Sequence, residues 1–255
     1  MRKLVIATAL AVGAAGLAAV AAPAQAGVPW LVTVKADATQ VTVGQTVSFS
    51  GKVTPGARAA GLKVVLQERV GKRWKGQDTD KLSARGRYHL SDKPTVNTSR
   101  QYRVVMPATG AHAKGISPNV KVEVYDWSKL IDHDSVNAEG IFPISSLNMN
   151  GVSYPSSLTT NWTDATSIEF NVNRLCIALK GTFGIDDRSE TGAQATVSAL
   201  ADGTQVYTHT FAVGEKAVQR IALDSPLKLK FTALSAVTGV NGFGAIGTPQ
   251  ILCTR

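Results

Sequence analysis

The sequence lacks the short motifs that accompany most catalytic centres. It has four histidines, and none lies in a metal-binding spacing such as H-E-x-x-H. No G-x-S-x-G segment is present, which excludes a nucleophile elbow of the α/β-hydrolase type. Asp186 and Asp187 are neighbours, and neighbouring side chains on an extended strand point to opposite sides. They cannot face one glycosidic bond as a glycosidase pair must. These absences argue against an enzyme.

Long apolar runs are absent after the first 26 residues. Arg2 and Lys3 precede an Ala-rich apolar run over 4–22, and an A-Q-A segment supplies the pattern that signal peptidase cleaves. A transmembrane helix is the alternative, because the run is almost long enough to cross a bilayer. Ala and Gly are only weakly apolar, which favours cleavage. We therefore expect residues 1–26 to be a signal peptide. The mature protein is expected to be secreted, extracellular or cell-wall associated, and not membrane-spanning.

Cysteine is scarce, since Cys176 and Cys253 are the only two. There is no C-x-x-C pair and no nearby histidine cluster, which argues against a redox or metal-binding role. An exported chain meets an oxidising compartment, so we expect one disulfide between them, with two buried free thiols as the alternative. The entropy of closing so long a loop would give a stabilisation of about 4.5 kcal/mol.

Acidic residues are scarce in the first half of the mature chain. Residues 27–125 carry 16 Lys and Arg against 6 Asp and Glu, whereas residues 126–255 carry 9 against 12. Opposite net charge in the two parts indicates two domains with different partners. Basic side chains gather around Trp74 in the segment 69–75. This cluster could bind an anionic polymer, or it could be a basic surface that contacts only water. Nucleic acid is not expected as a partner, because no recognition fold for it is evident.

The mature chain shows period-two alternation of apolar residues, which is typical of half-buried strands. In residues 27–125, Val47, Phe49 and Val53 share one face, and turn signals separate the short strands. This pattern predicts a β-sandwich. The segment VTVGQTVSFSGKV, followed by KVVLQERVGKRWK and GRYHL, resembles bacterial immunoglobulin-like domains. The resemblance implies a fold and no particular function.

Residues 126–255 are also predicted to be β-strands, which makes the expected fold all-β. Leu175–Phe183 is apolar enough for a central strand covered on both faces, and Asp126–Ser135 is the only helical candidate. Asn150-Gly151 and Asp202-Gly203 predict tight hairpin turns, because Asn, Asp and Gly tolerate positive φ.

The stretch from Leu147 to Phe231 combines the Asn150-Gly151 turn, a G-I-D-D segment at 184–187 and the Asp202-Gly203 hairpin. In order and spacing it resembles the NPCBM-type carbohydrate-binding module associated with glycoside hydrolase family 98. The resemblance implies a jelly-roll-like β-sandwich that binds carbohydrate. This family usually continues its first turn into G-L-G-x-H-A, where the present chain has S-L-T-T-N-W. The scaffold motifs are kept and the ligand motifs are not, which implies a different sugar or a fold without the activity.

Sugars bind to an aromatic face flanked by planar hydrogen-bonding groups, so aromatic residues in loops are the first candidates. Trp162 and Phe243 are expected in loops near asparagines, with core or rim packing as the alternative for both. We predict that one of them stacks on a sugar. The predicted polar contacts are Asn161, Asp187, Arg188 and Asn241. Trp127 is expected to pack at the domain junction.

A calcium site is a further hypothesis for the same region. Asp186, Asp187 and Glu190, with loop carbonyls, could supply the hard oxygen ligands that Ca²⁺ prefers. The alternative is a polar turn in which Arg188 pairs with a carboxylate.

The predicted function is binding of extracellular or cell-surface carbohydrate by a secreted, non-catalytic protein. The alternative is a structural or adhesive envelope protein. In that case the basic N-terminal domain would hold anionic wall polymers, and the second domain would be a spacer without a sugar site.

Overall fold

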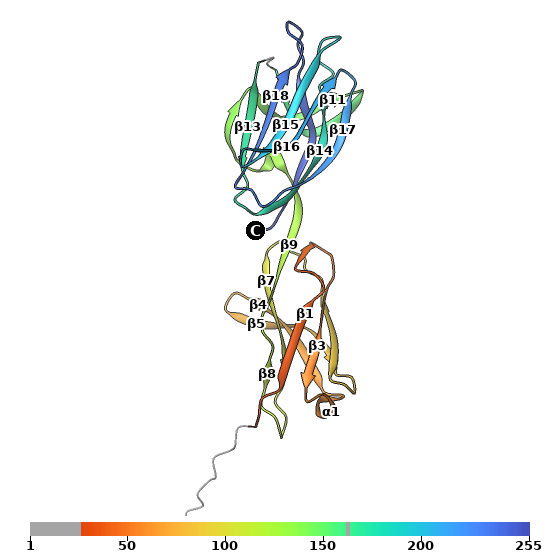
Figure 1. Cartoon of the computed structure of the whole chain (residues 1–255), viewed down its shortest axis with the longest axis vertical. Helices are drawn as coiled ribbons and strands as arrows, with labels where there is room; N and C mark the ends of the chain where they lie inside the picture. Colours follow the sequence, from red (N-terminus) through yellow and green to blue (C-terminus); the bar gives the residue numbers. More distant parts are fainter. Residues whose placement is uncertain (1–26, 162–163) are drawn as a thin grey trace, which may run out of the picture.

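The computed structural model describes residues 27–161 and 164–255. The predicted signal peptide and Trp162 lie outside the described residues. The described chain forms two lobes stacked end to end along the long axis of the molecule (Figure 1). Strands β1 to β19 make up nearly all of its regular structure, which confirms the all-β prediction. Among the described residues, none of the helices has the length and apolar character needed to cross a membrane.

The first lobe packs two sheets face to face. One sheet has the order β1-β3-β6, formed by β1 (Leu31–Ala36), β3 (Val47–Thr54) and β6 (Arg87–Asp92). The other contains β2 (Gln40–Thr42), β4 (Lys63–Val70), β5 (Arg73–Lys81), β7 (Ser99–Met106), β8 (Gly115–Ile116) and β9 (Val120–Lys129).

The alternation in the sequence places the apolar side chains of the first lobe between its sheets. Val47, Phe49 and Val53 are fully buried, and the Phe49 ring packs 4.7 Å from that of Tyr102. A single helical turn, α1 (Gly56–Ala59), follows β3. The two-sheet arrangement suits a β-sandwich, and the resemblance to immunoglobulin-like domains stays a prediction.

Strand β9 runs through both lobes. Its residues 120–125 pair with β7 and β2, whereas residues 126–129 pair with β19 (Gly244–Cys253) of the second lobe. Tyr125 packs against Ala178 and Leu252, and the Asn97 side chain donates a hydrogen bond of 3.3 Å to the Cys253 carbonyl. The lobes are therefore joined by one continuous strand and by contacts beside it (Figure 1).

The second lobe is also a two-sheet sandwich. One sheet has the order β10-β13-β18-β15-β16, formed by β10 (Ser135–Glu139), β13 (Thr166–Asn171), β18 (Lys228–Ser235), β15 (Gln194–Ala201) and β16 (Thr204–Ala212). The facing sheet joins β19 and the end of β9 to β11 (Ile141–Met149), β12 (Val152–Thr160), β14 (Cys176–Ile185) and β17 (Lys216–Ala222). The core between them is built on Phe170, Phe183, Phe211 and Phe231.

The predicted disulfide is present. Cys176 and Cys253 face each other on the neighbouring strands β14 and β19, with an S–S distance of 2.02 Å. Both predicted hairpin turns are confirmed as well. Asn150 and Gly151 adopt φ values of 47° and 68°, and Asp202 and Gly203 adopt 47° and 83°. These are the left-handed conformations that Asn, Asp and Gly accept at low cost.

One of two further expectations is wrong, and the other is confirmed. The helix predicted for Asp126–Ser135 is limited to a 3₁₀ turn, Leu130–Asp132, because the residues before it continue the ladder of β9 with β19. The strand predicted at Leu175–Phe183 is central, since β14 pairs with both β17 and β19. Its inward face carries the buried Leu179 and Phe183. Its outward face is also largely buried, at Ala178 and Thr182, with Lys180 half-buried between them.

Candidate functional site

Two segments lie side by side at the end of the second lobe that is remote from the first. One follows β14 and covers 186–190, and the other precedes β19 and covers 241–243. The Asp186 amide donates to the Phe243 carbonyl at 2.9 Å, and the Glu190 amide donates to the Asn241 carbonyl at 3.0 Å. The chain therefore brings residues more than fifty positions apart together at one set of loops.

Asp186 anchors this region to the core. Its side chain is 2% exposed, and Oδ2 accepts hydrogen bonds from Arg188 Nε at 3.0 Å and Nη2 at 2.8 Å. The Thr159 hydroxyl donates to the same oxygen at 3.2 Å, and the Arg188 amide donates to Oδ1 at 3.0 Å. Arg188 itself stays 52% exposed, so one face of the guanidinium is held and the other meets solvent.

Asp187 points toward the turn between β11 and β12. Its Oδ1 accepts from the Asn150 amide at 2.6 Å, and its Oδ2 accepts from the Gly151 amide at 2.9 Å. Both carboxylate oxygens therefore stabilise a turn whose amides have no partner within the hairpin. Asp187 was predicted from the sequence as a sugar contact, and this structural role across the fold is not visible in the sequence.

Phe243 and Asn241 lie beside Arg188 on the second segment. Phe243 is half-buried, and the Arg188 Cζ atom is 5.6 Å from the centre of its ring. Asn241 is exposed, and its side-chain amide donates to Glu190 Oε1. Three of the predicted contacts, Arg188, Asn241 and Phe243, are thus neighbours, and Glu190 holds the carboxamide of Asn241 in one orientation.

The three carboxylates named as calcium ligands have different partners in the structure. Asp186 is paired with Arg188, Asp187 faces a backbone turn, and Glu190 accepts hydrogen bonds from Asn241. In residues 27–161 and 164–255, no group of three or more His, Cys, Asp or Glu side chains could hold a metal ion. Asp186, Asp187 and Glu190 therefore do not form a common set of ligands.

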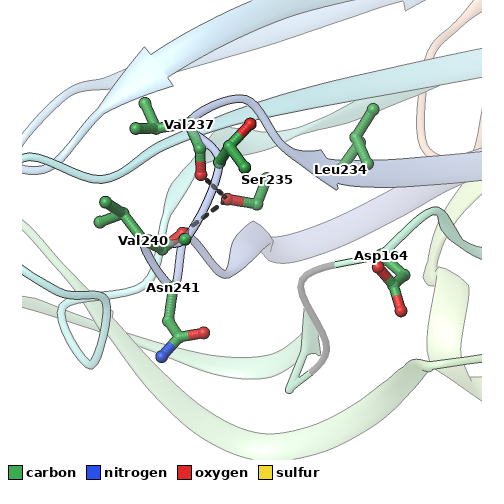
Figure 2. Close-up of a pocket in the computed structure, with 8 residues that line it drawn as sticks. Asp164, Leu234, Ser235, Val237, Val240 and Asn241 are labelled. Atoms are coloured by element: carbon green, nitrogen blue, oxygen red, sulfur yellow. Dashed lines mark hydrogen bonds between the residues drawn. The ribbon is translucent and has the colours of Figure 1, made fainter.

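A cavity of about 320 Å³ lies beside Asn241. Its wall is the loop from Val237 to Asn241, with Leu234, Ser235 and Asp164. Figure 2 shows Asn241 and Asp164 reaching this cavity from two different loops. The Ser235 hydroxyl donates to the Val240 carbonyl at 2.8 Å and also contacts that of Val237 at 3.4 Å, which fixes the loop (Figure 2).

Asn161 is exposed and belongs to the same connection, between β12 and β13, as Asp164. Trp162 lies between them in the sequence and outside the described residues. Asp164 and Ser235 are not among the site residues predicted from the sequence. Their residue types are common in loops, and only the folded chain places them around one cavity.

Residues 117–242 match the NPCBM/NEW2 domain family. The C-terminal half of this chain contains an NPCBM/NEW2 domain. The resemblance stated from the sequence is therefore confirmed for this half. The match begins at Ser117, so it includes β9 together with the second lobe.

Solved structures similar to this chain include carbohydrate-binding modules. A CBM51 from Clostridium perfringens GH95, in complex with methyl-galactose, has 13% identity, covers 49% of this chain and 99% of its own, and has a TM-score of 0.42. The CBM51-2 and INT domains of Clostridium perfringens ZmpB have 12% identity, cover 62% of this chain and 38% of their own, and have a TM-score of 0.40. A family 29 carbohydrate-binding module has 11% identity, covers 50% of this chain and 88% of its own, and has a TM-score of 0.30. No curated protein matches the sequence.

Proposed function

We propose that this is a secreted, non-catalytic protein whose NPCBM/NEW2 domain binds an extracellular or cell-surface glycan through its distal loops. The observation that carries the proposal is the meeting of Arg188, Asn241 and Phe243 on two adjacent segments, with Asn241 also lining a cavity. The match to the NPCBM/NEW2 family supports the same assignment.

The chemistry of these side chains suits a sugar. A half-buried ring such as Phe243 offers a flat apolar surface for the C–H face of a pyranose. The free edge of the Arg188 guanidinium offers donors. Asn241 keeps its carbonyl oxygen as an acceptor while Glu190 holds its amide group. Because Asp186 and Glu190 fix these groups before any ligand arrives, binding costs little side-chain entropy.

The proposed lack of catalysis rests on the carboxylates of the site. Glycoside hydrolysis needs two carboxyl groups facing each other across the sugar, about 5–10 Å apart. Asp186 is buried in its bonds with Arg188 and Thr159, and Asp187 is turned to the β11–β12 hairpin. Neither lines the cavity beside Asn241. Both line a second hollow of about 290 Å³, where Asp186 is bonded to Arg188 and Asp187 to the amides of the hairpin. This arrangement supports a binding role.

A glycan array tests the proposal with residues 27–255. We expect Asn241→Ala and Phe243→Leu to lose at least tenfold in binding, because each removes a sugar contact while keeping most of the bulk of the loop. Asn119→Ala changes an exposed asparagine in the first lobe and is the matched control. Absence of signal for the folded wild-type protein on every glycan would contradict the proposal.

The envelope-adhesive alternative draws on one observation in the first lobe. Asp78 accepts a hydrogen bond from the Ser91 amide of β6, and Asp80 accepts one from the His89 amide, both at 2.8 Å. These two carboxylates therefore bind β6 and do not pair with the basic side chains of the β4–β5 hairpin. This alternative predicts that binding to wall polymers falls steeply with salt and requires residues 27–125.

A further inference from the structure

A row of cations crosses the outward face of the second lobe, far from the distal loops. In the strand register Lys129 of β9 stands opposite Gln250 of β19, Gln250 opposite Lys180 of β14, and Lys180 opposite Arg220 of β17. Directly opposed residues of antiparallel strands point to the same face of the sheet. The row Lys-Gln-Lys-Arg therefore lies on one surface, four strands wide.

This arrangement is electrostatically unfavourable in the unbound protein. Like charges directly opposite each other on neighbouring strands destabilise a sheet, and Lys180 and Arg220 are such a pair. Among the described residues, no carboxylate lies within ion-pair distance of Lys129, Lys180 or Arg220. On the other sheet of the same lobe, by contrast, Lys228 is paired with Glu169 at 2.8 Å. The second lobe therefore pairs a cation with a carboxylate on one sheet, whereas the cations of this row have no carboxylate partner among the described residues.

Trp127 completes the surface. Lys180 Nζ is 4.2 Å from the centre of its ring, and Arg220 Cζ is 5.4 Å from it, so both cations gather at one aromatic ring. The ring is half-buried and packs on the patch formed by Ala178 and Leu252. The two opposed alanines of the next row, Ala178 and Ala222, have no long side chains that would cover this surface.

We propose that this face binds an anionic sugar chain, with Lys129, Lys180 and Arg220 on its acidic groups and Trp127 beneath the two cations, Lys180 and Arg220, that it holds together. The positive charge of the row complements acidic groups. At about 4.8 Å between neighbouring strands the row is roughly 14 Å long, which is longer than one acidic group and suits a chain that carries several. The match to the NPCBM/NEW2 family favours a sugar chain over other polyanions, so the choice of ligand rests on the proposed function. This surface is separate from the distal loops, so either site can fail without the other.

Titration of residues 27–255 with polygalacturonate, a carboxylated sugar chain, tests the proposal, with neutral dextran as the uncharged probe. We expect the wild type to bind polygalacturonate and not dextran. The double variant Lys180→Gln/Arg220→Gln should lose at least tenfold in affinity. The matched control, Lys228→Gln/Lys230→Gln, removes the same charge from β18 of the other sheet and should bind within twofold of the wild type.

A melting curve separates loss of the surface from loss of the fold. The melting temperature of Lys180→Gln/Arg220→Gln should stay close to that of the wild type, because the variant loses a like-charge pair and two cation–π contacts together. Trp127→Phe keeps a ring and should weaken binding less than Trp127→Ala. Wild-type protein that ignores polygalacturonate would overturn the proposal. Equal losses in the two double variants would also overturn it, because they would show attraction to net charge alone.

Discussion

The guanidinium of Arg188 donates two hydrogen bonds to one carboxylate oxygen of Asp186. Asp186 is buried, whereas Arg188 is about half exposed and reaches toward the Phe243 ring. The pair therefore connects the core of the second lobe to the surface that we assign to glycan binding. Removing either partner should affect both stability and binding.

Arg188→Met removes the guanidinium and leaves the Asp186 carboxylate buried with fewer partners. We expect the free energy of unfolding to fall by about 2 kcal/mol, the cost of losing hydrogen bonds to a buried charged group. Urea unfolding measures this loss, and Arg174→Met, an exposed arginine elsewhere in the lobe, is the control with little change. An unchanged midpoint for Arg188→Met would show that Asp186 does not depend on its partner.

Asp187→Ala removes both acceptors from the Asn150-Gly151 turn. Each lost hydrogen bond contributes about 1 kcal/mol, so we expect a loss of about 2 kcal/mol in thermal or urea unfolding. Asp187→Asn keeps one acceptor oxygen and should lose about half as much. Equal stability of the alanine variant and the wild type would rule out the anchoring role.

The disulfide should stabilise the second lobe through the long loop that it closes. Replacing both cysteines by alanine, or adding a reductant, should lower the free energy of unfolding by about 4 kcal/mol. The reductant should not change the double alanine variant, which is the control for effects of the reagent itself. Wild-type stability that is insensitive to the reductant would contradict this role.

Asp202 should make stability depend on pH. Hydrogen bonds from the Lys228 and Leu227 amides hold the pKa of Asp202 below its usual value of 3.8. A carboxyl with a lowered pKa stabilises the fold above its unfolded pKa, and this contribution is lost as the pH falls through the folded pKa. We therefore expect Asp202→Asn to melt below the wild type at pH 7 and to approach it at pH 2. A constant difference between the two proteins across this range would show no linkage.

The sequence predicted the framework of this protein because the framework depends on local rules. Alternation marked the strands, and Asn150-Gly151 and Asp202-Gly203 marked two hairpins because their backbone needs positive φ. The disulfide followed from the presence of only two cysteines in a chain expected to be exported. Asp126–Ser135 was mistaken for a helix because its short apolar pattern does not show that Trp127 and Lys129 continue a strand from the first lobe.

The partners of the site residues could not be predicted in this way. Asp187 meets Asn150 across 37 positions, and Glu190 meets Asn241 across 51, so these bonds exist only after the sandwich has closed. The cavity beside Asn241 likewise combines Asp164 with a loop some seventy residues later, which no local pattern reveals.

Trp162 stays a prediction from the sequence alone. If it stacks on the sugar, Trp162→Ala should lose binding as strongly as Phe243→Leu, with an unchanged melting temperature. Trp162→Phe keeps an aromatic face and should retain part of the binding. Full binding by Trp162→Ala would assign the stacking role to Phe243 alone.

The most direct test of the central claim is a glycan array probed with residues 27–255 at low and at high salt. Our account predicts signal on a defined set of neutral sugars that persists at high salt, because stacking and short hydrogen bonds are little screened, and that disappears in Asn241→Ala and Phe243→Leu. Signal that vanishes with salt, or that both variants retain in full, would contradict it.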